Sequence, residues 1–186
     1  MRGILLGIAP DDNHWAAATV AAEKLLGIFT GGATRAHTVL NGLASLATHA
    51  AEDDWVMVHD AVRPCVRLQD IDSLIEKATA NIDGGLLAIP VSDTVKRADG
   101  SQRVEQTVPR NNLWRALTPQ LFRWKHLEQA LQQALARGVD VTDEAGAIEA
   151  AGGRPLLVPG HADNIKVTTP EDLPLAELYL RQQGGT

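Results

Sequence analysis

Four groups of small or polar residues lie at the ends of short apolar runs or just beyond them, and their types suit the binding of a phosphorylated ligand. The sharpest group is Asp60 and Arg63, an acid and a guanidinium three residues apart after the apolar run 55–58. Such a pair could hold a metal-bound phosphate from two sides, whereas the simpler alternative is a local ion pair that fixes a loop. The remaining groups are Gly31 and Gly32, Asp93 and Thr94, and Lys166 and Thr168.

Phosphoryl or nucleotidyl transfer is the chemistry that these residue types favour. Positioning and charge neutralisation do most of the catalysis in such reactions, and no nucleophilic side chain is required. Glycines allow the backbone to approach a ligand closely. The cations that could neutralise its charge are Arg63, Arg110 and Lys166. We therefore expect an anionic substrate pair.

Other chemistries find less support in the sequence. The six histidines show no HxH or HxxxH spacing, and Cys65 is the only cysteine, so a zinc site is not expected. No GxSxG motif is present. His59 is expected to pack or hydrogen-bond near a strand end, with a general-base role as the less favoured alternative. Asp143 and Glu144 need only the helix dipole as an explanation, although metal binding is the alternative.

Length and composition predict one globular domain, residues 1–186. The formal charge of −6 argues against a nucleic-acid partner. No apolar run reaches the roughly 18 residues that cross a membrane, and the apolar residues 1–10 lack a basic region, so they are expected as a strand rather than a signal peptide. The single cysteine makes the cytoplasm the expected compartment.

The predicted elements that position these residues alternate between strand and helix. Strands are expected at 3–9, 25–29, 55–58, 86–90, 113–117, 156–158 and 165–167. Helices are expected from residue 14 or 15 to before 27, from about 34, and at 70–80, 124–137, 143–151 and 169–182. This alternation is typical of an α/β fold with a doubly wound, mostly parallel sheet. Ligands bind at the carboxyl ends of the strands in such sheets.

Residues 91–112 differ from the rest because they contain a polar hairpin with little apolar surface. Its strands are expected around Lys96 and Glu105, with a turn at Asp99 and Gly100. A projecting arm of this kind is marginally stable alone and usually finds a partner subunit. We therefore predict a dimerisation arm, with a mobile surface hairpin as the alternative.

Six stretches, in order and spread over nearly the whole chain, resemble the 2-C-methyl-D-erythritol 4-phosphate cytidylyltransferase family. The stretches are GGATRAHTVLNGL, VHDAVRP, PVSDTVK, TVPRNNLWRALTPQLF, TDEAGAIE and NIKVTTPEDL. The resemblance implies a Rossmann-like nucleotidyltransferase fold. It also implies the reaction of CTP with methylerythritol phosphate, a sugar-alcohol phosphate, assisted by Mg²⁺, to give the cytidine diphosphate product and pyrophosphate for isoprenoid precursor synthesis.

The same resemblance implies a role for each candidate site residue. Lys166 and Asp60 would be catalytic, with Asp60 also the ligand of the metal. Residues on the nucleotide side would be Gly31, Gly32, Thr38, Asp60 and Ala61. Residues on the sugar-phosphate side would be Arg63, Thr94, Arg110, Thr118 and Thr168. Thr94 and Arg110 would be contributed by the arm of the partner in a homodimer.

The chain also departs from the family pattern. Members of the family begin with a strand and a glycine-rich loop that wraps the triphosphate, and no counterpart precedes Met1. We therefore expect a domain truncated at its amino end relative to the family and impaired in catalysis. The absent loop motivates one alternative, a non-catalytic, dimerising remnant of the fold. A second alternative is a pentitol-phosphate cytidylyltransferase, since VHDAVRP and NIKVTTPEDL would suit both enzymes.

Overall fold

The computed structural model describes residues 2–13, 15 and 24–184. The chain divides into two compact units. Unit 1 comprises Met1–Val58 and Leu121–Pro155, and unit 2 comprises His59–Gln120 and Leu156–Thr186. That residues 1–186 form one domain stays a prediction. The helix expected from residue 14 or 15 to before 27 lies almost wholly outside the described residues.

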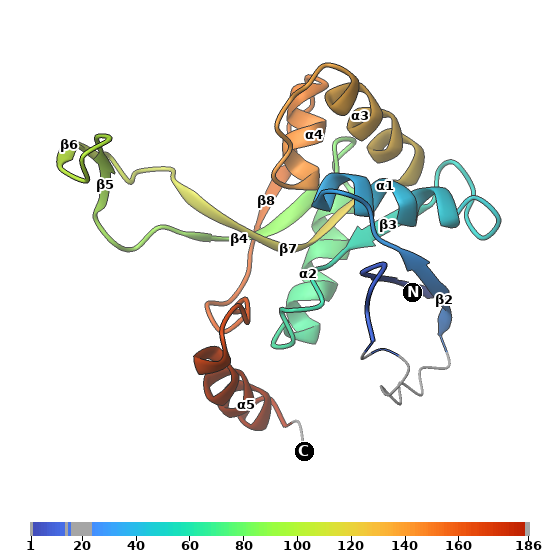
Figure 1. Cartoon of the computed structure of the whole chain (residues 1–186), viewed down its shortest axis with the longest axis horizontal. Coiled ribbons are helices and arrows are strands. Elements are labelled where there is room, and N and C mark those ends of the chain that lie inside the picture. Colours follow the sequence, from blue (N-terminus) through green and yellow to red (C-terminus); the bar gives the residue numbers. More distant parts are fainter. Residues whose placement is uncertain (1, 14, 16–23, 185–186) are drawn as a thin grey trace. The chain divides into compact units, whose positions relative to one another are not determined.

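Within its described residues, unit 1 contains a parallel pair of strands, a further strand and three α-helices (Figure 1). β1 (Ile4–Ile8) pairs with β2 (Leu25–Thr30). α1 (Arg35–Ser45) contacts β2 and α3 (Trp124–Ala136), and α3 contacts α4 (Glu144–Ala150). In α3, the apolar residues recur at helical spacing and are buried, as predicted, because that spacing places them on one face. They are Leu127, Ala130, Leu131 and Ala134.

β3 (Trp55–Val58) is the neighbour of β7 (Trp114–Arg123), whose last residues belong to unit 1. Trp124 follows them, and its backbone N–H donates to the carbonyl of Asp54 over 2.8 Å. Its indole Nε1 donates to the carbonyl of Leu43 over 3.0 Å, so the ring is buried with its one polar group satisfied.

Unit 2 is built on β4 (Gly85–Pro90), which lies between β7 and β8 (Leu156–Pro159). β4 and β8 are parallel, with Gly85 opposite Leu156. A Cβ at Gly85 would lie 2.7 Å from the carbonyl oxygen of Leu156, so only glycine fits this close approach. α2 (Leu68–Thr79) contacts both strands and buries Leu74 with the core of the unit.

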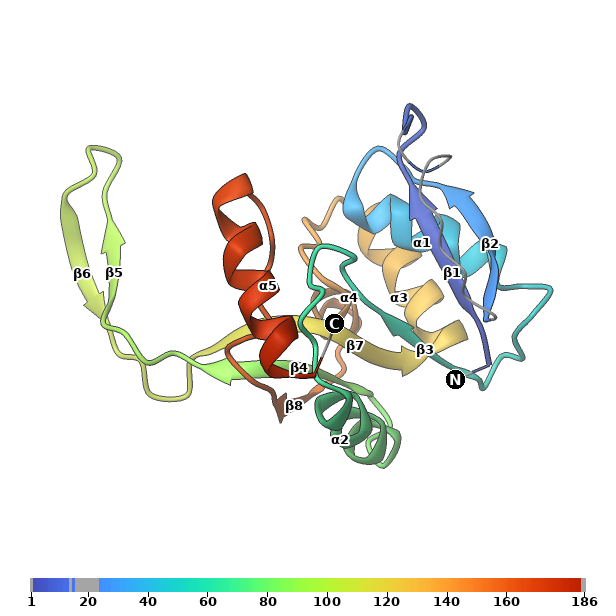
Figure 2. The same cartoon turned by 90° about the horizontal axis from the view of Figure 1, so that it is seen from below.

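The arm projects from the ends of β4 and β7, as both views show (Figures 1 and 2). Its strands are β5 (Val95–Ala98) and β6 (Val104–Val108), which pair antiparallel. The carboxylate of Asp99 accepts hydrogen bonds from the backbone N–H groups of Ser101 and Arg103 and so closes the turn. The predicted hairpin is confirmed, whereas its role in dimerisation stays a prediction.

Most of the expected elements are confirmed, and the α/β class with it, but two strand predictions are wrong. β7 does not end at Leu117, because it continues through Pro119 to Arg123, and residues 117–122 are buried. The strand expected at 165–167 is a loop, in which the N–H of Val167 donates to the carbonyl of Val62 over 2.8 Å.

The carboxyl-terminal helix begins with a single 3₁₀ turn, Pro170–Asp172, and continues as α5 (Leu173–Gln182). None of the described helices is both long and apolar enough to cross a membrane.

Candidate active site

In unit 2, Asp60, Arg63 and Lys166 form what we call the acid–cation cluster. Lys166 Nζ lies 3.2 Å from Asp60 Oδ2, and Arg63 Nε lies 3.8 Å from the same oxygen. The side chains of Asp60 and Arg63 are only 15% and 13% exposed, whereas that of Lys166 is 44% exposed. One shielded carboxylate oxygen therefore faces two cations, and the lysine is the more accessible of them to a ligand.

The position of Asp60 depends on β7. The backbone N–H of Asp60 donates to Oγ1 of Thr118 over 3.0 Å, and Thr118 is buried. His59 Nδ1 lies 3.0 Å from the same hydroxyl oxygen, and His59 Nε2 lies 3.0 Å from the carbonyl oxygen of Arg63. Desolvation lowers the pKa of His59 below its ordinary value, although the hydrogen bond to Arg63 and the charge of Asp60 act in the opposite direction.

Asn164 connects the loop that carries Lys166 to the same network. Arg63 Nη1 donates to the carbonyl of Asn164 over 2.9 Å, and Asn164 Nδ2 donates to the carbonyl of Thr118 over 2.8 Å. Asn164 is only 1% exposed. Sequence reasoning missed it, because an uncharged amide two residues before a lysine carries no signal beyond the family stretch NIKVTTPEDL.

Thr168, another predicted residue of unit 2, makes local contacts, and Ala61 lies beside the acid–cation cluster in the sequence. The hydroxyl of Thr168 donates to Asp172 Oδ2 over 3.1 Å at the start of the last helix. The N–H groups of Thr168 and Thr169 donate to the same carboxylate oxygen, and these bonds lower the pKa of Asp172. Ala61 follows Asp60 and is exposed. The binding roles of Thr168 and Ala61 stay predictions.

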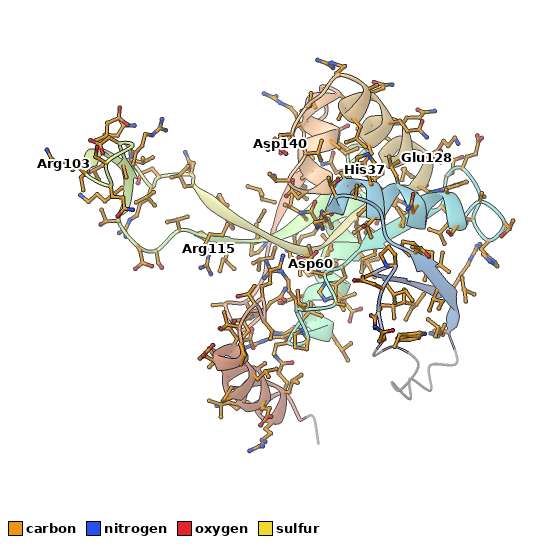
Figure 3. The ribbon with its side chains drawn as sticks, in the orientation of Figure 1. His37, Asp60, Arg103, Arg115, Glu128 and Asp140 are labelled. Carbon is orange, nitrogen blue, oxygen red and sulfur yellow. The ribbon has the colours of Figure 1, made fainter. Side chains whose placement is uncertain are left out.

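Thr94 and Arg110 lie at the base of the arm, where the structure brings the two strands together. Val95, next to Thr94, pairs with Val108, and the guanidinium of Arg110 donates to the carbonyl of Ser92. Both Thr94 and Arg110 are exposed. Arg103, by contrast, lies at the far end of the arm, away from Asp60 (Figure 3).

In unit 1, residues 30–34 form what we call the glycine loop, which leads into α1. Gly31 N–H donates to the carbonyl of Ile8 over 2.8 Å, and Gly32 N–H donates to Oγ1 of Thr38 over 2.9 Å. The Thr38 hydroxyl in turn donates to the carbonyl of Thr34, the N-cap of α1. A Cβ at Gly32 would lie 2.4 Å from Cβ of His37, which Figure 3 labels on α1, so the loop packs on the helix only because this residue is glycine.

The first residue of α1 makes a partly buried ion pair that sequence reasoning missed. Arg35 Nη1 lies 2.6 Å from Glu144 Oε1, and Arg35 Nη2 lies 3.0 Å from Oε2. Glu144 is only 1% exposed, and this burial raises its pKa, although Arg35 acts in the opposite direction. Asp143 does cap α4, by accepting from the N–H of Gly146, but Glu144 has a specific partner rather than the helix dipole alone.

The described residues contain no group of three or more His, Cys, Asp or Glu side chains that could hold a metal ion by themselves. Magnesium needs no such group, since it is often bound through one or two carboxylates together with substrate phosphates. Asp60 could serve as that carboxylate, so the residues present fit the ion. The site is therefore one for anionic ligands, with or without a metal.

Comparison with known proteins agrees with this chemistry. The family model for 2-C-methyl-D-erythritol 4-phosphate cytidylyltransferase matches residues 1–182. The chain belongs to this family. A relative from Tolumonas auensis is 48% identical over 180 residues, which cover 97% of this chain and 77% of the relative. One from Xanthomonas campestris pv. campestris is 52% identical over 187 residues, which cover 100% of this chain and 71% of the relative. Both are named 2-C-methyl-D-erythritol 4-phosphate cytidylyltransferase.

Solved structures of the family share the fold. A crystal structure of a 4-diphosphocytidyl-2C-methyl-D-erythritol synthase is 41% identical, with a TM-score of 0.83, and the match covers 95% of this chain and 81% of that one. The structure of the Francisella tularensis 2-C-methyl-D-erythritol 4-phosphate cytidylyltransferase is 35% identical, also with a TM-score of 0.83, and the match covers 96% of this chain and 81% of that one. The α/β nucleotidyltransferase fold expected from the sequence is confirmed.

Proposed function

We propose that this protein transfers the cytidylyl group of CTP to 2-C-methyl-D-erythritol 4-phosphate and releases pyrophosphate, a step of isoprenoid precursor synthesis. The observation that carries the proposal is the acid–cation cluster, in which Lys166 lies 3.2 Å from Asp60 in a chain of this family. The arrangement provides an accessible cation next to a shielded carboxylate, which suits the transfer of a charged phosphoryl group.

Charge neutralisation is the main contribution of the protein to this reaction. A phosphate oxygen of methylerythritol phosphate attacks the α-phosphorus of CTP, and the bond from that phosphorus to the oxygen bridging to the β-phosphate breaks. The new bond joins the two phosphates of the product, and the electron pair of the broken bond leaves with pyrophosphate. Lys166 neutralises the negative charge that spreads over the α-phosphate in the transition state. Arg63 binds the phosphate of the sugar alcohol, because a guanidinium matches the geometry of phosphate.

Asp60 would hold Mg²⁺ together with the phosphates of the nucleotide. When bound, the ion supplies further neutralisation of the triphosphate charge. Asp60 also fixes Lys166 through their ion pair, so the lysine amine is oriented before any substrate arrives.

The nucleotide and the partner subunit account for five further predicted residues. Gly31, Gly32 and Thr38 contact the cytosine and ribose through the backbone of the glycine loop and the Thr38 hydroxyl on α1. The arm, residues 91–112, clasps a second copy of the chain and lends it Thr94 and Arg110. Support for the clasp comes from the exposure of the arm, where even Val104 is 64% exposed. The cytoplasm is the expected compartment, since the chain has one cysteine.

The test is an assay of pyrophosphate release with CTP, Mg²⁺ and methylerythritol phosphate. We expect release that depends on both substrates, and at least tenfold less with ribitol phosphate in place of methylerythritol phosphate. Equal or faster release with ribitol phosphate would assign the chain to pentitol phosphates. No release with either acceptor, from a preparation that is folded by circular dichroism, would overturn the proposal.

A further inference from the structure

The hydrogen bonds of His59 determine which of its ring nitrogens carries the proton. Nε2 lies 3.0 Å from the carbonyl oxygen of Arg63, and a carbonyl oxygen can only accept. Nε2 must therefore donate. With a bare Nε2, two acceptors would face each other at this distance, and neither would have a partner.

For a neutral His59 ring, whose one proton is then on Nε2, the hydroxyl of Thr118 has one arrangement that satisfies every group. Its oxygen accepts the backbone N–H of Asp60 over 3.0 Å and lies 3.0 Å from Nδ1 of His59. If Nδ1 carries no proton, it accepts the hydroxyl hydrogen of Thr118. Each donor in this chain then meets one acceptor, from Asp60 through Thr118 and His59 to the backbone of Arg63.

We propose that His59 is a positioning residue of the active site, with its proton on Nε2. In this form it fixes the Arg63 backbone and turns the Thr118 hydroxyl hydrogen away from any ligand. The proposal rests on the proposed function for its kinetic consequences, but not for the position of the proton. His59 acts through Asp60, Thr118 and Arg63, and it touches none of the reacting atoms.

This arrangement has a consequence for the acceptor substrate. Thr118 Oγ1 already donates its hydrogen to His59, so a substrate group that meets it must be a hydrogen-bond donor. A phosphate oxygen of the substrate is an acceptor, whereas the hydroxyl groups of the sugar alcohol can donate. Thr118 therefore selects a hydroxyl of methylerythritol phosphate, and the phosphate is left to cations such as Arg63. The hydrogen bond from Asn164 Nδ2 to the Thr118 carbonyl holds this strand residue in place.

The first test locates the proton directly. The full chain is labelled with ¹⁵N at histidine, and two-bond ¹H–¹⁵N spectra are recorded at mildly alkaline pH without substrates. The His59 signals are those missing from the spectrum of His59→Gln. We expect the pattern of a protonated Nε2 and a bare Nδ1. A proton on Nδ1 overturns the proposal, and this result does not depend on what reaction the protein catalyses.

The second test separates the two hydrogen bonds kinetically. His59→Asn keeps an acceptor near the position of Nδ1 and loses the donor to Arg63, whereas His59→Gln keeps a donor near Nε2 and loses the acceptor for Thr118. For each variant we expect the KM for methylerythritol phosphate to rise about tenfold, with the KM for CTP changed less than twofold. His59→Phe should lose both bonds and raise the KM for methylerythritol phosphate about 100-fold. The control is His126→Asn on α3, which should behave like the parent chain.

A double variant tests whether His59 acts through Thr118. His59→Phe combined with Thr118→Val should raise the KM for methylerythritol phosphate by less than the product of the two single effects, because both changes break the hydrogen bond between Thr118 and His59. Fully additive costs, or a His59→Phe variant with an unchanged KM for methylerythritol phosphate, would overturn the proposal. If His59→Phe does not fold, His59→Asn and His59→Gln are each combined with Thr118→Val and compared with the single variants in the same way. If the parent chain releases no pyrophosphate, the proposed function fails while the labelling experiment still decides the position of the proton.

Discussion

The glycine loop of unit 1 and the acid–cation cluster of unit 2 are both candidate ligand sites, but they are built from different groups. The loop is built from backbone groups and small hydroxyls that hydrogen-bond within unit 1, and the adjacent charge, Arg35, is paired with the buried Glu144. The cluster presents charges directly, with two cations on one carboxylate oxygen. The loop therefore suits an uncharged ligand such as a nucleobase, and the cluster suits phosphates.

The two regions also differ in what holds them rigid. The loop depends on shape, because a side chain at Gly32 would collide with α1. The cluster depends on a polar network, in which Thr118 and Asn164 hold residues far apart in the sequence. Changes of charge should therefore damage the cluster most, and changes of volume should damage the loop most.

The largest expected effect is that of Lys166→Met. Removal of the accessible cation should lower kcat for pyrophosphate release by about 10²–10³-fold, while the KM for CTP changes less. The measurement is steady-state kinetics with both substrates varied. Lys125→Met is the matched control, since Lys125 is paired with Glu128 on α3. If the kcat of Lys166→Met lies within threefold of the parent value, the acid–cation cluster takes no part in the catalytic step.

Asp60→Asn should have the next largest effect. The change removes the charge that faces both cations but keeps the shape of the side chain, and we expect kcat to fall about 100-fold. The Mg²⁺ concentration for half-maximal rate should rise, because a carboxylate ligand is lost. Asp72→Asn, at an exposed position of α2, is the control. An unchanged Mg²⁺ dependence would mean that Asp60 orients Lys166 without binding the metal.

Gly32→Ala tests the loop. A Cβ at this position would lie 2.4 Å from Cβ of His37, so the loop or α1 must shift. We expect the KM for CTP to rise about tenfold with kcat nearly unchanged, and the free energy of unfolding to fall by about 1–3 kcal/mol. Gly100→Ala is the control, because a Cβ there has no neighbour within 4 Å. If Gly32→Ala lowers kcat and leaves the KM for CTP unchanged, the loop does not bind the nucleotide.

The charged part of the site could be predicted from the sequence, because acids and cations at the ends of apolar runs are visible in one stretch of chain. Asp60, Arg63 and Lys166 were found in this way, and the structure brings them together. The network that holds them could not be predicted, because it depends on how distant segments meet. Thr118 and Asn164 have ordinary side chains, and only their tertiary contacts make them supports of the site.

For the fold as well, features set by one stretch of chain could be predicted, whereas features set by contacts between distant segments could not. Helical spacing predicted α1 and α3 well, because the period of apolar residues is a local property. The strand expected at 113–117 stops before Pro119, a residue that cannot donate to a sheet, yet β7 continues to Arg123 between its neighbours. Ile165 and Val167 flank Lys166 in a pattern that resembles a strand, but these residues form a loop in which the N–H of Val167 donates to the carbonyl of Val62. Pairing partners, which no single stretch reveals, decided both cases.

Glu144→Gln should have the smallest effect, and it concerns the pH dependence of stability. Burial raises the pKa of Glu144 above its ordinary value of 4.5. Between that value and the raised one, the folded state binds a proton that the unfolded state has released. The stabilisation from this proton is therefore complete below pH 4.5 and is lost as the pH rises through the raised pKa.

Glutamine cannot titrate, so the free energy of unfolding of the parent chain should fall relative to that of Glu144→Gln as the pH rises through this window. Urea unfolding at a series of pH values measures the difference. Glu177→Gln is the control, because this carboxylate on α5 is 65% exposed, and its curve should run parallel to that of the parent. A difference between parent and Glu144→Gln that grows in favour of the parent with rising pH would mean that Arg35 outweighs burial. The ion pair beside the glycine loop would then stabilise unit 1 by its charge. In that case unit 1 would depend on polar interactions as well as on shape, and the two regions would no longer differ in this respect.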